Sequence, residues 1–215
     1  MKAYYDIIQK SDEWFEIKHS RIGGTRSGTA DKTLLPEIVG ELTEPFYGGE
    51  EGFTSHAMQR GIDLEPLARE TLEAELFIQL KECGWLQSDD NDLLGISPDG
   101  ITECETIMCE IKCPSAKKHM EQVLSTEILP DYVDQLIHAF IVNEKLEKHY
   151  FVSFRPENTK KPLWYRELTK DSEVNIGTLA RPVMAKIEDE VKKRLEAFNS
   201  FRSKVYETID GLSHI

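Results

Sequence analysis

Two carboxylates and a lysine lie close together in residues 97–114, "SPDGITECETIMCEIKCP". Asp99 stands at a Pro-Asp-Gly turn, and Glu110 and Lys112 come at the end of a run with strand character. Side chains alternate along a strand, so Glu110 and Lys112 project from one face, and pairing across the turn brings Asp99 near Glu110. With the backbone carbonyl of Ile111, the two carboxylates offer hard oxygen ligands suited to Mg²⁺ or Mn²⁺. Lys112 can orient or deprotonate a water, so the set predicts metal-assisted phosphodiester cleavage.

The same residues also have an ordinary interpretation, because Asp-Gly is a common turn and Glu-x-Lys a common solvated ion pair. Two distant residues favour the chemical one. Glu65 directly precedes Pro66, which suits the first turn of a helix or kinks one. Gln135 lies on an otherwise apolar helix, where it is either half-buried and satisfied or holds a water for attack.

The elements that must position these residues alternate between helices and short strands. Helices are expected at residues 11–20, 25–35, 54–60, 66–77, 115–126, 131–142 and from about 179 onward; strands at 84–88, 93–97, 100–103, 106–113, 148–156 and 163–168; and a glycine-rich loop at 44–53. Ser11 and Asp131 are expected to cap their helices, Gly61 to separate two helical pieces, and Pro182 to interrupt the last helix early. This order predicts a mixed α/β fold in one domain, residues 1–215, with a central sheet covered by helices and a long C-terminal helix.

The charge balance restricts the partners. The chain of 215 residues has a formal net charge of −13, which argues against a protein that coats nucleic acid with its whole surface. The negative net charge is compatible with an enzyme that holds nucleic acid in a local basic channel. The candidate bases are Arg21, Arg26, Arg60, Lys117 and Lys118.

Several other classes are disfavoured. The four cysteines contain no CxxC pair, so neither a zinc site nor an iron–sulfur cluster is expected. The cysteines are expected to be free, buried thiols. A phosphate-binding Gly-rich loop with lysine does not occur, so ATP is not an expected cofactor. There is neither an apolar run of membrane-spanning length nor a signal-peptide pattern at the N-terminus, so a cytoplasmic protein without membrane partners is expected.

The segments "RGIDLEPLARE", "GISPDG", "CEIKCP" and "YVDQLIHAFIV", in this order, resemble the family of lambda exonuclease and the YqaJ-like viral recombinases. That family belongs to the PD-(D/E)xK nuclease superfamily. The early segment "RIGGTRSG" resembles the family's Arg…Gly-Gly-Ser segment, with threonine in place of serine. The resemblance extends over about residues 14–154 and implies a restriction-endonuclease-like core.

The resemblance also implies roles for individual residues. The residues concerned are Asp99 and Glu110 as metal ligands with the Ile111 carbonyl, Lys112 as the catalytic lysine, Glu65 near a second metal or the attacking water, and Gln135 as the water-positioning residue. Arg21 matches the basic residue of the family's 5′-phosphate pocket, and either Thr25 or Ser27 matches its hydroxyl partner.

The activity implied by the resemblance is that of a Mg²⁺- or Mn²⁺-dependent 5′→3′ exonuclease. It would degrade one strand of linear double-stranded DNA and leave 3′ single-stranded tails for phage-type recombination in a bacterial host. A single-strand annealing protein and a trimeric ring of identical subunits are the implied partners. The alternatives are another nuclease of the superfamily, of endonuclease, repair or CRISPR-adaptation type, and a catalytically inactive protein that binds DNA ends.

Overall fold

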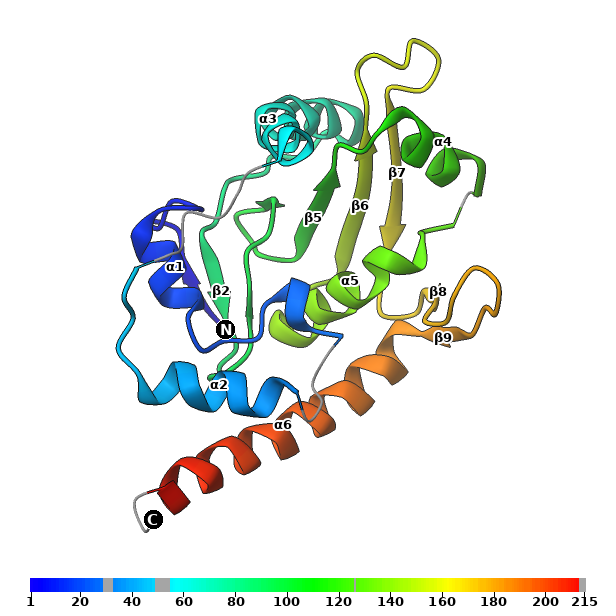
Figure 1. Cartoon of the computed structure of the whole chain (residues 1–215). Coiled ribbons are helices and arrows are strands. Elements are labelled where there is room, and N and C mark those ends of the chain that lie inside the picture. Colours follow the sequence, from blue (N-terminus) through cyan, green and yellow to red (C-terminus); the bar gives the residue numbers. More distant parts are fainter. Residues whose placement is uncertain (29–32, 49–54, 126, 213–215) are drawn as a thin grey trace.

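A mixed four-stranded sheet in the order β4-β5-β6-β7 forms the centre of the computed structural model (Figure 1), which describes residues 1–28, 33–48, 55–125 and 127–212. Its strands are β4 (Gly100–Ile101), β5 (Ile107–Lys112), β6 (Lys148–Phe154) and β7 (Leu163–Leu168). β5 and β6 run parallel, and the other two pairs are antiparallel. β6 is buried along almost its whole length, as its aromatic and β-branched sequence predicts for an internal strand.

Two smaller antiparallel sheets flank this one. Their strands are β1 (Lys2–Tyr4), β2 (Trp85–Gln87) and β3 (Gly95–Ile96), in that order, and the pair β8 (Glu173–Asn175) and β9 (Met184–Lys186). The segment between β3 and β4 contains the Pro-Asp-Gly turn, so the turn joins the first sheet to the central one.

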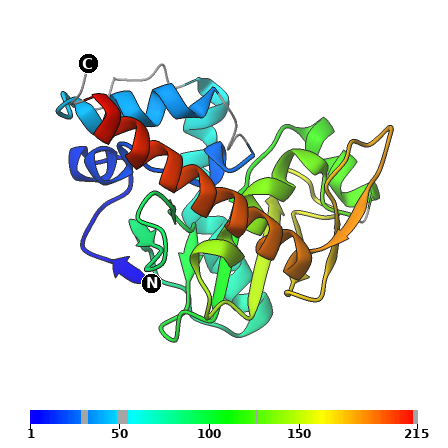
Figure 2. The same ribbon diagram turned by 90° about the horizontal axis from the view of Figure 1, so that it is seen from below.

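Helices cover both faces of the central sheet. They are α1 (Asp12–Lys18), the 3₁₀ turn η1 (Gly24–Arg26), α2 (Leu34–Thr43), α3 (His56–Leu76), α4 (Ala116–Ser125), α5 (Pro130–Val142) and α6 (Ile187–Leu212). Viewed from below, α6 crosses the molecule and lies beside α2 toward its C-terminal end (Figure 2). None of the helices in the described ranges is long and apolar enough to cross a membrane.

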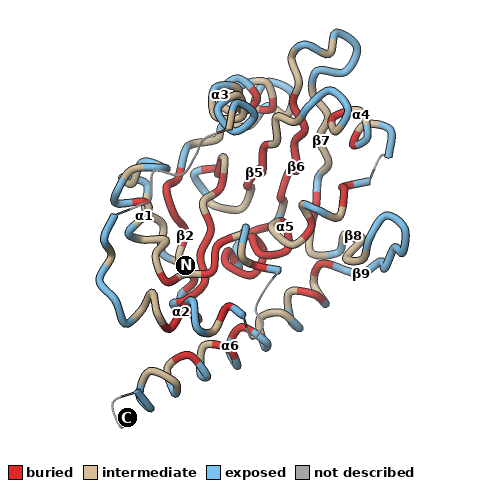
Figure 3. The backbone as a smooth tube through the Cα atoms, viewed as in Figure 1, coloured by how far each residue is buried: buried red, intermediate tan, exposed pale blue. Residues whose placement is uncertain are grey.

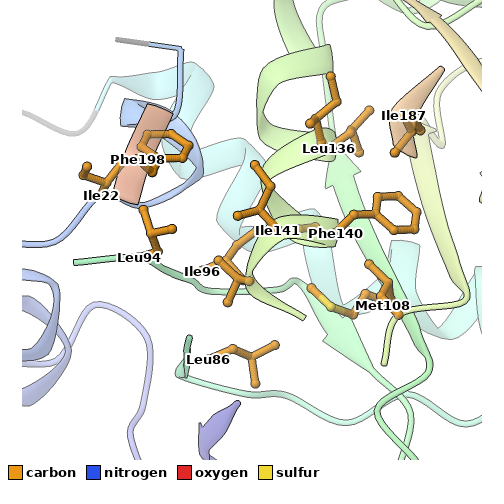
Figure 4. Close-up of a cluster of buried hydrophobic side chains, with 14 of the residues drawn as sticks. Ile22, Leu86, Leu94, Ile96, Met108, Leu136, Phe140, Ile141, Ile187 and Phe198 are labelled. Atoms are coloured by element: carbon orange, nitrogen blue, oxygen red, sulfur yellow. The ribbon is translucent and has the colours of Figure 1, made fainter. Parts of the chain in front are cut away.

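The two faces of β5 belong to two separate apolar clusters. On one face Cys109 and Ile111 pack with Ala68 and Leu72 of α3. On the other, Met108 belongs to the main core with side chains of α5, α6 and the first sheet; among its members are Leu86, Ile96, Leu136, Phe140, Ile187 and Phe198 (Figure 4). The buried positions accordingly concentrate on β5, β6 and α5, between exposed outer helices (Figure 3). Glu110 and Lys112 share the face of Met108, as the period of two predicts.

Most expected elements are present, and Ser11 caps α1 by accepting a hydrogen bond from the Trp14 N–H at 3.3 Å. The run of short strands expected within residues 84–113 reads as one meander, and this is wrong in one respect, since the strands are divided between two sheets. Asp131 is also not the cap of α5. Leu129 occupies that position and Pro130 begins the helix, which fits because proline needs no amide partner in the first turn.

Three helix boundaries differ from expectation. The two pieces around Gly61 are one helix, α3, with Pro66 inside it, because an internal glycine costs a helix only about 1 kcal/mol. Residues 25–35 do not form one helix: Thr25 and Arg26 belong to η1, α2 begins at Leu34, and residues 29–32 lie outside the described ranges. α6 begins at Ile187 and not near Leu179, because the segment with Pro182 leads into β9. In the loop expected at 44–53, residues 44–48 carry no helix or strand, and 49–53 lie outside the described ranges.

Candidate active site

Asp99 lies at the edge of β5, directly before the first residue of β4. Gly100 pairs with Cys109, so the next position in the same antiparallel register sets Asp99 opposite Glu110. The Asp99 carboxylate replaces the missing strand neighbour, because its Oδ2 accepts the backbone N–H of Ile111 at 2.6 Å. The amide and carbonyl of one strand residue face the same edge, so the Ile111 carbonyl is directed to the side of Asp99.

Glu110 and Lys112 form a buried ion pair on the adjoining face. Glu110 is 2% exposed, and the Lys112 ammonium donates to its Oε1. The same ammonium lies 3.3 Å from Oε1 of Gln135 and 5.9 Å from the ring centre of Tyr132, both on α5. Burial alone lowers the pKa of Lys112, but Glu110 and Asp99 raise it above its ordinary value, so the lysine is held as a cation.

Glu65 reaches the site from α3. Its Oε1 lies 3.5 Å from Nη2 of Arg69, whose Nη1 is 2.9 Å from Glu82. Burial raises the pKa of Glu65, and the cations Lys10 and Arg69 oppose that shift. Arg69 itself is almost fully buried, so it holds Glu65 on the side of the helix that faces the sheet.

The site carries more buried negative charge than its lysine balances. Asp99 is half-buried, and desolvation together with the neighbouring Glu110 and Glu65 raises its pKa well above the ordinary value. Such crowding of carboxylates is unfavourable unless protons or a cation compensate, and oxygen donors of this kind suit Mg²⁺ or Mn²⁺. In the described ranges, no three His, Cys, Asp or Glu side chains converge closely enough to hold a metal by themselves. The donor set therefore fits a divalent cation whose shell is completed by the Ile111 carbonyl, water or substrate oxygen.

A cavity of about 520 Å³ opens beside η1. It is lined by Phe15, Lys18, His19, Arg21, Gly23, Thr25, Arg26, Glu41, Phe46 and Gly48. Arg21 and Thr25 thus face one cavity. Ser27 does not share it: this buried residue donates from Oγ to the Gly24 carbonyl at 2.6 Å and lines a smaller cavity with Asp134 and Arg194.

Gly24 of η1 packs against Gln135 of α5. A Cβ at this position would lie only 2.7 Å from Cγ of Gln135, so η1 rests directly on the residue that contacts Lys112. His138, one turn further along α5, links the same elements: its Nε2 lies 3.1 Å from the Ile22 carbonyl and 3.0 Å from the Gly95 carbonyl. It is fully buried, as expected for a packed, hydrogen-bonded histidine.

The other candidate bases have partners of their own. Arg26 pairs with Glu37 and Glu41, Arg60 donates to the Cys113 carbonyl and pairs with Glu157, Lys117 pairs with Glu121, and Lys118 pairs with Asp131. Arg60 thereby anchors the segment that leaves β5. All four cysteines are free, as expected, but Cys104 is exposed and Cys113 only half-buried.

Three residues near the carboxylates or in the cavity beside η1 were not foreseen from the sequence. Arg69 is spaced four residues from Glu65 on one helix, a signal that could have identified their pairing. Lys18 lies over the Trp14 ring at 3.7 Å, and burial, followed by the charge of Arg26, lowers its pKa to about 8. Nothing in the sequence around Tyr132 indicated its position beside Lys112, because aromatic residues on an apolar helix usually belong to the core.

Comparison with known proteins agrees with this architecture. The alkaline exonuclease LHK-Exo from Laribacter hongkongensis superposes with a TM-score of 0.74 at 20% identity, over 95% of this chain and 97% of that one. Its complex with dAMP gives 0.71 at 22% identity with the same coverage. A phage-related exonuclease from Haemophilus somnus gives 0.50 at 12% identity, over 89% of this chain and 97% of that one. Curated protein sequences give no significant match.

The likeness to these structures shows a shared fold. The family model for the YqaJ-like viral recombinase domain matches residues 13–145, a range that contains Arg21, Glu65, Asp99, the Glu110–Lys112 segment and Gln135. The chain therefore belongs to the YqaJ-like viral recombinase family and has the nuclease fold of the alkaline exonucleases.

Proposed function

We propose that this protein is a divalent-metal-dependent deoxyribonuclease that degrades one strand of linear double-stranded DNA from its 5′ end. The observation that carries the proposal is the arrangement at the end of β5. There Asp99 and the buried Glu110 stand opposite each other beside Lys112, whose ammonium also contacts Gln135. Family membership and the shared fold support a nuclease.

Each residue has a task in this proposal. Asp99, Glu110 and the Ile111 carbonyl supply oxygen ligands, and Glu65 adds a carboxylate from the α3 side, reached through water. Lys112 stays protonated between the carboxylates and offsets the negative charge that develops on the phosphate. Gln135, held beside Lys112, orients the attacking water. A bound Mg²⁺ or Mn²⁺ would lower the pKa of water and stabilise the anionic transition state.

The cavity beside η1 is proposed as the site of the 5′-phosphate. Arg21 supplies a guanidinium that can form paired hydrogen bonds to phosphate oxygens, and Thr25 supplies a hydroxyl from the same wall. Lys18 adds positive charge. Because η1 rests on Gln135, a terminal phosphate bound here would set the distance from the DNA end to the reacting phosphodiester.

Digestion of linear 5′-phosphorylated duplex, compared with covalently closed circles, tests the proposal in Mg²⁺ and in EDTA. Linear duplex should disappear only with the metal, and closed circles should remain intact. Cleavage of closed circles would identify an endonuclease of the same superfamily. Binding of duplex ends without cleavage in either Mg²⁺ or Mn²⁺ would instead identify an end-binding protein.

Assembly and partners are part of the same proposal. We expect a trimeric ring, whose channel would confine duplex DNA while the acidic exterior faces solvent, and a single-strand annealing protein that takes up the 3′ tails. Light scattering after size exclusion tests the trimer, and a monomer at micromolar concentration would contradict it.

A further inference from the structure

Lys10 occupies a backbone conformation that favours glycine. Its φ is 71°, and it lies at the third position of the turn that the Ser11 N–H closes onto the Ile8 carbonyl at 3.1 Å. An L-residue with a side chain is strained in this left-handed region, whereas glycine is not. Lysine gains nothing local in return: among the described residues its exposed side chain has neither an ion pair nor a hydrogen bond.

The turn is fastened to the segment that presents Asp99. The side-chain amide of Gln9 donates to the Cys83 and Pro98 carbonyls, each at 3.0 Å, and Pro98 directly precedes Asp99. On the other side of Lys10, the Trp14 indole donates to the Gly84 carbonyl and to the Ser97 hydroxyl. Lys10 is therefore fixed on both sides to the edge of the carboxylate site.

The charge of Lys10 acts on that site. Lys10 and Arg69 are the two cations whose charges act on Glu65. The other cations around the site are engaged with carboxylates: Lys112 with Glu110, Arg69 with Glu65 and Glu82, Arg60 with Glu157, and Lys118 with Asp131. In the described chain, Lys10 is the cation at this edge that lacks an ion pair within 4 Å.

We propose that Lys10 binds a phosphate of the DNA backbone beside the cleavage site. Phosphates that approach three carboxylates in a chain of net charge −13 need a cation at the point of entry, and a solvated lysine on a rigid turn provides one. The backbone strain at this turn is then the cost of placing a charge where glycine would fit best. This inference rests on the proposed nuclease function and adds a contact to it.

Equilibrium binding of a labelled, 5′-phosphorylated duplex in EDTA, measured over a series of salt concentrations, tests the contact. Lys10→Gly removes the charge and relieves the backbone. It should weaken binding at low salt by roughly two- to fivefold and lower the slope of log affinity against log salt by about one. Its melting temperature should be unchanged or raised, which separates lost contact from lost fold.

Two further variants complete the experiment. Lys10→Arg keeps the charge and should retain the parental salt slope. Lys192→Ala removes a cation that pairs with Glu188 on α6, and it should also retain the slope. A Lys10→Gly protein with parental affinity and slope would overturn the contact while leaving the nuclease proposal standing. A parent protein that binds no duplex would overturn both the Lys10 contact and the nuclease proposal. Cleavage of linear duplex in Mg²⁺, measured separately, tests the nuclease proposal by itself.

Discussion

The backbone N–H of Ile111 donates to Asp99 across the end of the sheet, at 2.6 Å. This bond fixes the carboxylate at the position that the next residue pair of β4 would occupy if the strand continued. It also keeps Asp99 beside the buried Glu110, where desolvation and like charge disfavour the ionised form of Asp99. A short strand thus leaves one edge open, and the site is built in that opening.

Asp99→Asn should abolish cleavage without unfolding the protein. The asparagine carbonyl can still accept the Ile111 N–H, but one ionised ligand is lost, so the cleavage rate should fall by about 10²- to 10⁴-fold. Initial rates on linear duplex and a melting curve measure both effects. Asp171→Asn, which alters an exposed carboxylate paired with Lys186, is the matched control. A parental rate in Asp99→Asn would remove Asp99 from the site.

The stability of the metal-free protein should depend on Asp99 and on pH. A carboxyl with a raised pKa in the folded state stabilises the fold below its unfolded pKa of about 4, and this contribution is lost as the pH rises through the folded value. In EDTA, the parent should therefore lose stability relative to Asp99→Asn as the pH rises from about 4. At pH 8, Mg²⁺ at 100 times its Kd should restore about 2.7 kcal/mol to the parent, and much less to the variant. Equal Mg²⁺ effects on the two proteins would contradict a metal at Asp99.

Mutations of Thr25 and of Ser27 should have different effects on the preference for 5′-phosphorylated ends. Arg21→Ala and Thr25→Ala should reduce the preference for 5′-phosphorylated over unphosphorylated ends, the arginine change by about 10- to 100-fold. Ser27→Ala should leave that preference intact and lower stability by about 1 kcal/mol, since it removes the bond to the Gly24 carbonyl. The measurement is the ratio of digestion rates on the two ends. If Ser27→Ala alone lost the preference, the proposed pocket would be wrong.

Gly24→Ala should slow the reaction through Gln135. The new methyl group would lie 2.7 Å from Cγ of Gln135 and displace the amide from Lys112, so kcat should fall by more than stability does. Gly61→Ala is the contrasting change, because its Cβ would meet nothing within 4 Å inside α3. That variant should gain up to about 1 kcal/mol in free energy of unfolding. Unchanged kcat in Gly24→Ala would show that Gln135 tolerates the shift.

Acid should destabilise the fold through two buried histidines. Burial lowers the pKa of both His138 and His149 to about 4. A histidine with a lowered folded pKa stabilises the fold above pH 6.5, and that contribution falls as the pH approaches 4, by at most about 3 kcal/mol for each residue. Urea unfolding between pH 7 and 4.5 measures the loss, and His149→Leu should halve it. A flat pH profile would mean that neither histidine stays neutral in the fold.

The sequence alone was sufficient to assign the side chains of β5 to its two faces. A period of two assigns Glu110 and Lys112 to one face and Cys109 and Ile111 to the other, and a short turn limits where Asp99 can lie. These are local relationships, which backbone geometry decides before any long-range contact forms. The Ser11 cap was predictable for the same reason, because it depends on a residue type at a defined position before one helix.

Only the tertiary structure decided how distant segments meet. Whether Pro66 starts a helix or lies within one depends on the packing of Ala68 and Leu72 against the sheet, not on proline itself. Thr25 faces the cavity of Arg21 and Ser27 turns away from it because η1 rests on α5, 110 residues further along the chain. The turn that contains Lys10 lies beside Asp99 because Gln9 donates to the Pro98 carbonyl, a contact across 89 residues. Such contacts leave little periodic trace in a sequence, since many side chains would be compatible with each position and the packing of whole elements selects among them.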